Sequence, residues 1–350
     1  MTVKTLMILL DAADPVLVRK WAAEGQLPLL ASMLEGGDHR DVQNLPAFGS
    51  GAFWPSICTG LDPSHHGRYY LAQPRPPVYA VEDFAKNFHA APFWKDLEDQ
   101  GKKIVVFDAP ESPIAGLKNG IEIYDWLSHR TDGPPASFPP DLIGDLTARY
   151  GNDPFDGNSN LAFRRGMTEA EVIRRCANRT KQRTDATQEL MNDGNWDMFL
   201  VNYSEPHCVG HLVWHLHDGR AQASDRSDKS PLLRCYQDID SAIGRLLPSV
   251  EPNGKVLIVL GPGMETLVTF NSLFPEILRA YQGRQRKPAK RWLSDTATRL
   301  MVSGLLPDRL SQALRRTKRR VASKARRRAN LRYFAVPNND NAGAVRVSLK

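Results

Sequence analysis

Short apolar runs recur along the chain and are separated by segments with helical periodicity. Residues 4–11 (KTLMILLD) form a nearly continuous apolar run that ends in an acid, and comparable runs occur at 103–108, 197–203 and 255–260. Runs that are apolar at nearly every position are typical of strands buried on both faces of a parallel sheet. Helices are predicted at 15–24, 28–34, 92–100, 167–193 and 231–247. This alternation predicts an α/β/α sandwich with a mostly parallel central sheet.

The first of these helices has clear start and stop signals. Asp14 precedes Pro15, which suits an N-cap residue followed by proline at the first helical position. Gly25 follows the last periodic residue and is expected to end the helix. We expect the apolar side of the helix to comprise Val16, Val18, Trp21 and Ala22.

Three stretches do not follow this alternation of strands and helices. Residues 68–90 and 127–160 are rich in Pro, Gly, Asp and Asn and predict long surface loops, which often carry function. Residues 284–332 keep a helical register through a basic run. The sequence therefore predicts an α/β core at 1–283, a basic helical insert at 284–332 and a final strand returning to the core at 333–350. Truncation of the chain after that strand stays open.

The composition is that of a soluble globular protein, with 41% hydrophobic and 24% charged residues in a chain of 350. No run approaches the roughly 18 apolar residues of a membrane span, so no transmembrane segment is predicted. The amino terminus lacks a small-residue cleavage site, and a cytoplasmic location is expected. The four cysteines are far apart and predict reduced thiols. For Cys208, a reactive thiol and a packed thiol are both open.

The net charge of +7 comes from one segment. Residues 315–332 contain ten Arg or Lys and no acid, so removing these ten charges from +7 leaves −3 for the rest of the chain. Three interpretations remain open: a solvated helix, a surface for nucleic acid or anionic lipid, and steering of an anionic ester toward a catalytic site. The candidate contact residues are Arg315, Arg316, Lys318, Arg319, Arg320, Arg326, Arg327 and Arg328.

A histidine cluster follows the third apolar run. Four of the nine histidines fall in EPHCVGHLVWHLHD (205–218), and His207, His211 and His215 are spaced i, i+4, i+8. On a helix, this spacing places three imidazoles on one face. Because the cluster comes directly after a predicted strand, it should lie at the carboxyl edge of the sheet, where open α/β sheets bind their ligands. The cluster is therefore a candidate for metal binding.

Five motifs stand in order along the chain. They are LLDAADPVLVRKWAAEGQLPLLASMLEGG (9–37), PAFGSGAFWPSICTGLDPSHHG (46–67), SEPHCVGHLVW (204–214), VLGPGM (259–264) and RYFAVPNNDNAGAVRVSL (332–349). Together they resemble the type I phosphodiesterase/nucleotide pyrophosphatase family of the alkaline phosphatase superfamily. The resemblance implies an alkaline-phosphatase-like fold and a metal-dependent hydrolase of phosphate esters, with an anionic ester as its substrate.

The resemblance also assigns roles to individual residues. It implies two divalent metal ions, above all zinc, and a Ser or Thr nucleophile, whose place Ser50 takes. Asp11, His207 and His211 match metal-ligand positions, although His207 stands where the family pattern has an aspartate. Imidazole can replace carboxylate on zinc, so metal binding is still expected. Further candidate ligands are Glu205, His215, His217 and Asp218.

The chain also departs from the family pattern. Gly261 and Pro262 take the place of the family's Asp-His pair, and neither side chain can coordinate a metal. One interpretation is a phosphoric ester hydrolase with Ser50 as nucleophile. The alternative is a catalytically impaired pseudoenzyme that binds an anionic ligand, or a partner through its basic helix. A third interpretation is a protein that binds nucleic acid or a membrane and keeps the fold of the family.

Overall fold

The computed structural model divides the chain into two compact units. It describes residues 2–43, 50–70, 72–75, 80–83, 90–129, 134–159, 166–217, 230–265, 273–283, 333–336 and 344–347. The first unit comprises 1–43, 53–62 and 90–266, and the second comprises 44–52, 63–89 and 267–350. The predicted basic insert at 284–332, with all of its candidate contact residues, lies outside the described residues.

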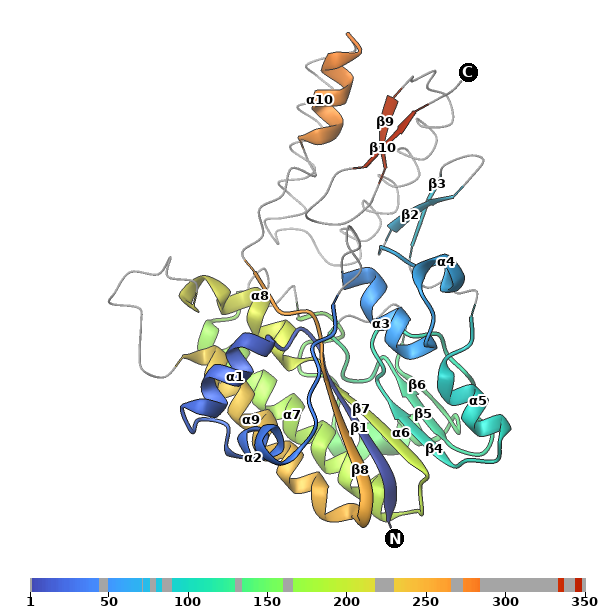
Figure 1. Cartoon of the computed structure of the whole chain (residues 1–350), viewed down its shortest axis with the longest axis vertical. Coiled ribbons are helices and arrows are strands. Elements are labelled where there is room, and N and C mark those ends of the chain that lie inside the picture. Colours follow the sequence, from blue (N-terminus) through green and yellow to red (C-terminus); the bar gives the residue numbers. More distant parts are fainter. Residues whose placement is uncertain are drawn as a thin grey trace. The chain divides into compact units, whose positions relative to one another are not determined.

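A six-stranded sheet forms the centre of the first unit (Figure 1). Its strand order is β6-β5-β4-β7-β1-β8. All neighbours pair in parallel except β6, which runs antiparallel to β5. The strands are β1 (Val3–Leu10), β4 (Ile104–Phe107), β5 (Ile121–Tyr124), β6 (Ala136–Phe138), β7 (Met198–Tyr203) and β8 (Val250–Leu260). The mostly parallel sheet predicted from the apolar runs is confirmed.

Helices cover both faces of this sheet because alternate strand residues point to opposite sides. In β1, Leu6 and Ile8 pack into one hydrophobic cluster, and Met7 and Leu9 pack into another. The first cluster includes residues of α1 (Pro15–Ala23), α2 (Pro28–Gly36), α6 (Leu142–Tyr150), α7 (Glu169–Asn192), α8 (Glu205–His217) and α9 (Pro231–Leu246). The second includes residues of α3 (Ser50–Thr59) and α5 (Phe93–Asp99). The result is the predicted α/β/α layering (Figure 1).

The first helix begins and ends as its sequence predicts. The Asp14 side chain accepts hydrogen bonds from the backbone N–H groups of Val16 and Leu17, at 2.9 and 3.0 Å. Gly25 has φ +71°, the left-handed conformation in which glycine commonly ends a helix. The predicted apolar side was partly wrong: Val16 is 68% exposed, and Leu17 is buried instead. Leu17 lies one turn before Trp21, so the i, i+4 stripe on the core selects it.

The two stretches predicted as long surface loops contain regular structure. Residues 127–160 include the antiparallel strand β6 and the helix α6, whose Leu146 is fully buried. Residues 68–90 include β2 (Ala72–Arg75) and β3 (Ala80–Asp83), which form an antiparallel pair. The loop prediction was wrong there because it weighted Pro and Gly content above the short periodic segments between them.

The second unit holds further small elements. They are α4 (Pro63–His66), the β2–β3 pair, α10 (Phe274–Tyr281), β9 (Tyr333–Val336) and β10 (Ala344–Val347). The strands β9 and β10 pair antiparallel in a sheet of two, and the return of the final segment to the core stays a prediction. A 3₁₀ turn at Leu247–Ser249 connects α9 to β8 in the first unit. Among the described helices, none has the length and apolar character that a membrane span requires.

Candidate metal centre

The candidate site lies where β1 and β7 end. Leu10 pairs with Tyr203 in the parallel register, and the next residue, Asp11, donates its backbone N–H to the Tyr203 carbonyl at 2.9 Å. Helix α8 begins at Glu205, two residues beyond the end of β7. Parallel pairing therefore brings Asp11 and the first turn of α8 to the same edge of the sheet, as the sequence predicts.

A chain of hydrogen bonds joins Asp11 to two histidines. One carboxylate oxygen accepts from Trp54 Nε1 at 2.7 Å, and the other lies 2.7 Å from His207 Nδ1. On the far side of its ring, His207 Nε2 lies 2.8 Å from His211 Nε2. Asp11 is buried, His207 is half-buried and His211 is exposed. The structure thus brings together all three residues that the resemblance matches to metal ligands.

The pKa shifts of this group follow from its hydrogen bonds. Burial opposes the charge on Asp11, but the charge and hydrogen bond of His207, with the Trp54 hydrogen bond, lower the pKa of Asp11 below its ordinary value. Burial likewise opposes the charge on His207, but Asp11 raises the pKa of His207 above its ordinary value. Although His211 as a residue is exposed, partial desolvation of its ring and repulsion from His207 lower the pKa of His211 to about 4. Asp11 and His207 therefore favour each other's charged form, whereas His207 disfavours a charge on His211.

A third histidine, His129, completes the cluster. Its ring stacks on His207 with centroids 3.8 Å apart and lies 5.6 Å from the ring of His211. The three side chains can each offer one ring nitrogen, and these nitrogens all lie within 4.8 Å of one another. The sequence interpretation missed His129 because it stands alone, with no spacing pattern around it. Its one signal was its place in a stretch, 127–160, that was predicted to carry function.

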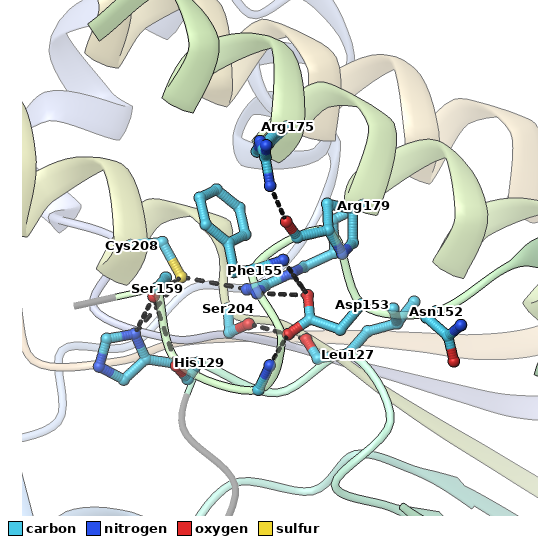
Figure 2. A network of polar contacts seen from close by, with 12 residues as sticks. Leu127, His129, Asn152, Asp153, Phe155, Ser159, Arg175, Arg179, Ser204 and Cys208 are labelled. Atoms are coloured by element: carbon cyan, nitrogen blue, oxygen red, sulfur yellow. Dashed lines mark hydrogen bonds and ion pairs between the residues drawn. The ribbon is translucent and has the colours of Figure 1, made fainter. Parts of the chain in front are cut away.

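A buried polar network holds the ring of His129 (Figure 2). His129 Nδ1 lies 2.9 Å from the Ser159 hydroxyl and 3.3 Å from the Cys208 sulfur. The same sulfur receives hydrogen bonds from Ser159 at 3.0 Å and from Arg179 at 3.3 Å, and Arg179 pairs with Asp153 at 2.6 Å. This chain of contacts reaches from the long helix α7 to the histidine cluster.

The thiol of Cys208 belongs to this network. It is fully buried, and burial raises the pKa of Cys208 to about 11 despite the nearby Arg179 guanidinium. A thiol in that condition stays protonated at neutral pH and is a poor nucleophile. The structure therefore favours the packed-thiol interpretation over a reactive cysteine.

The segment before His129 is anchored from the core. The Asp108 carboxylate, at the end of β4, accepts the backbone N–H groups of Trp126 and Leu127 at 3.1 and 2.9 Å. Arg183 of α7 pairs with Asp108 at 3.2 Å and also donates to the Leu127 carbonyl. Since all of these groups are buried, the backbone that leads to His129 is tightly fixed.

The other candidate residues are placed as follows. Glu205 is fully buried and lies 3.4 Å from the Arg183 guanidinium, so it serves a core ion pair, which argues against its recruitment as a metal ligand. His215 and His217 lie in α8, but their side chains are outside the described residues, as is the whole of Asp218. Ser50 is the first residue of α3, and its side chain is also outside the description.

Gly261 packs tightly beside Asp11. Its N–H donates to the Leu10 carbonyl at 2.9 Å. A Cβ at this position would lie 2.7 Å from the backbone nitrogen of Ala12 and 3.0 Å from Cζ2 of Trp54. Any side chain at Gly261 would therefore displace its neighbours, which explains in physical terms why the Asp of the family's Asp-His pair is not accommodated here.

Comparisons with known proteins give a family and a fold for the chain. The family model for type I phosphodiesterase / nucleotide pyrophosphatase matches residues 5–340. Two crystal structures of phosphonoacetate hydrolase from Sinorhizobium meliloti 1021, in complex with phosphonoacetate and with phosphonoformate, are similar at TM-scores of 0.54 and 0.53 and 15% identity. Each match covers 81% of this chain and 63% of the hydrolase chain, so this chain spans less than two thirds of that protein. Among curated proteins, no match was found.

Proposed function

Because the chain belongs to the type I phosphodiesterase/nucleotide pyrophosphatase family, we propose that it is a metal-dependent hydrolase of phosphoric or phosphonic esters. The observation that carries the proposal is the group of Asp11, His207 and His211 at the carboxyl edge of β1 and β7. Carboxylate and imidazole are ligands that zinc prefers in proteins. This edge of an open α/β sheet is also where such folds bind their substrates.

The donor set supports a divalent metal ion in this group. Two imidazole nitrogens, those of His207 and His211, lie 2.8 Å apart, and the Asp11 carboxylate lies 2.7 Å from the other ring nitrogen of His207. A bound divalent ion would supply Lewis-acid stabilisation of the charge that develops on the phosphoryl oxygens. His211 is exposed, which is compatible with access from solvent.

Ser50 is proposed as the nucleophile. It takes the nucleophile's place in the family motif and begins a helix of ten residues, Ser50–Thr59. Amide groups at a helix N-terminus favour a bound phosphoryl group. The Ser50 oxygen would form a bond to phosphorus as the bond from phosphorus to the leaving oxygen breaks. Water would then cleave the phosphoserine bond and restore the hydroxyl.

The proposal is tested by turnover of nitrophenyl phosphate mono- and diesters with added zinc or manganese. We expect Ser50→Ala to lower kcat by roughly 10³-fold or more, because the covalent step loses its nucleophile. Ser56→Ala, in the same helix, is the matched control and should retain the activity of the unchanged protein.

Two results would count against the proposal. The first is turnover by the unchanged protein that is no faster than turnover by Ser50→Ala, when the protein is loaded with metal and folded by circular dichroism. This result would reject the hydrolase proposal. It would favour the pseudoenzyme interpretation, in which the same fold only binds an anionic ligand. Equal losses in Ser50→Ala and Ser56→Ala would instead place the effect in the packing of α3 and reject Ser50 as nucleophile.

A further inference from the structure

We propose that His129, His207 and His211 together bind a single zinc-like divalent ion, with Asp11 outside its coordination sphere. This inference builds on the proposed function by naming the metal ligands of the same site. It differs from the family expectation in two respects. It adds a ligand, His129, that lies outside the motifs by which the chain resembles the family, and it replaces an expected pair of metal ions by one.

The separations among the three histidines suit one ion. Zinc–nitrogen bonds of about 2.0–2.1 Å in a tetrahedral site put ligand nitrogens roughly 3.3 Å apart. His207 Nε2 and His211 Nε2 are 2.8 Å apart, and the ring nitrogens of the three residues all lie within 4.8 Å. Adjustments on the order of half to one and a half ångströms would therefore form the site. Three protein ligands and one open position are the arrangement of a catalytic zinc.

Hydrogen bonds from several buried residues hold His129 in place. Its ring is held by Ser159 and Cys208, and the segment before it is held by Asp108 and Arg183 through Leu127. These contacts hold the ring of His129, which stacks on that of His207 with an interplanar angle of 18°. Because an imidazole nitrogen binds a metal in the plane of its ring, one of the two stacked rings must tilt for both nitrogens to reach one ion.

The contacts of Asp11 are those of a carboxylate that orients a metal-binding histidine without binding the metal itself. One of its oxygens accepts from Trp54 Nε1 and the other from His207 Nδ1, both at 2.7 Å. A metal-ligating histidine typically donates its second ring N–H to a carboxylate in this way, which fixes its tautomer and raises its basicity as a ligand. Asp11 would thus orient His207, and His207 Nε2 would reach the ion.

The surroundings of Asp11 leave no second metal site among the described residues. The family's second set needs the Asp-His pair, whose place is taken by Gly261 and Pro262. Gly261 is hydrogen-bonded to the Leu10 carbonyl and packs against Ala12 and Trp54. Backbone and indole atoms therefore fill the space on this side of Asp11, which supports a single ion within the part of the chain that the structure describes.

Metal content tests this inference independently of turnover. The full chain is incubated with excess zinc, dialysed, and its zinc counted by plasma mass spectrometry. We expect one zinc per chain in the unchanged protein and loss of stoichiometric zinc in His129→Asn. Asp11→Asn should weaken zinc binding by about 10- to 100-fold, the usual effect of removing an outer partner of a ligand. The exposed His39 provides the matched control, and His39→Asn should bind zinc as the unchanged protein does.

Cobalt provides a second measurement. Co²⁺ in place of zinc should give a visible absorption band of a histidine site, and His129→Asn should lose that band while its circular dichroism stays unchanged. Undiminished zinc and an unaltered cobalt band in His129→Asn would overturn the inference, as would two zinc ions per chain or none. If zinc binding depends on His129 but the protein does not hydrolyse esters, the hydrolase proposal is rejected and the metal-site inference stands. If turnover depends on Ser50 but zinc binding does not depend on His129, the metal-site inference is rejected and the hydrolase proposal stands.

Discussion

At the scale of single residues, the site depends on close packing as much as on its polar groups. Asp11 is positioned by Trp54, and Trp54 in turn packs against Gly261. The glycine is needed because its neighbours on both sides are too close for a side chain. In the sequence, Gly261 is notable only because it cannot bind a metal. In the structure, it is part of the packing that holds Asp11.

We expect Gly261→Ala to destabilise the protein by about 1–3 kcal/mol, the usual cost of overpacking. The added Cβ would lie 2.7 Å from the Ala12 nitrogen, and backbone cannot move away as a flexible side chain can. Urea unfolding of the variant measures the change. Gly144→Ala is the control: Gly144 lies in α6 with no atom within 4 Å of its added Cβ. It should be neutral or stabilised by up to about 1 kcal/mol. Equal stability of the two variants would contradict the argument.

At the scale of elements, apolar runs were sufficient to predict the strands at the centre of the sheet. The runs ending near Asp11, Asp108 and Tyr203 became β1, β4 and β7. Strands β5 and β6 were missed because each has only three or four residues in a segment rich in turn-forming residues. His129 follows β5, so missing that strand also hid the histidine. Asp11, His207 and His211 could be predicted because a strand end and a helical spacing marked them.

Contacts between elements also determine stability against acid. Glu98 of α5 accepts the backbone N–H groups of Lys118 and Asn119, just before β5, at 2.6 and 2.7 Å. Its other oxygen pairs with Lys95 at 2.8 Å. Burial alone would raise the pKa of Glu98, but the Lys95 hydrogen bond and the two backbone N–H groups lower it below its ordinary value. The charged form of Glu98 therefore fastens α5 to the segment that precedes β5.

We expect Glu98→Gln to cost about 1–3 kcal/mol at pH 7, because the backbone N–H groups of Lys118 and Asn119 lose a charged acceptor. Since the folded-state pKa of Glu98 is lowered, its stabilisation is present above the unfolded-state value, which is close to 4.5. It is lost as the pH falls through the folded-state pKa. The stability difference between the two proteins should therefore shrink as urea unfolding is repeated at lower pH. In the control, Glu35→Gln at an exposed site, the difference should be small at every pH. A constant gap for Glu98→Gln would contradict this account.

At the scale of the whole molecule, the proposed metal ion would connect distant parts of the chain. His129 follows β5, whereas His207 and His211 follow β7, and β4 lies between these strands in the sheet. The network beneath them joins residues as far apart in sequence as His129 and Cys208, which are 79 positions apart. A ligand bound across such a separation stabilises the folded state, because the unfolded chain cannot present the same site.

Zinc should therefore raise the unfolding temperature of the first unit. Binding to the folded state alone contributes about 2.7 kcal/mol when free zinc is 100 times its dissociation constant. For a unit of this size that amounts to roughly 5–10 °C. Each further tenfold rise in zinc should add about 1.4 kcal/mol. Differential scanning calorimetry across a zinc series measures the shift. Magnesium, which prefers oxygen ligands, should give little change. His129→Asn should lose most of the zinc effect, whereas His39→Asn should keep it. An equal zinc shift in His129→Asn would mean that the ion does not tie the segment after β5 to α8.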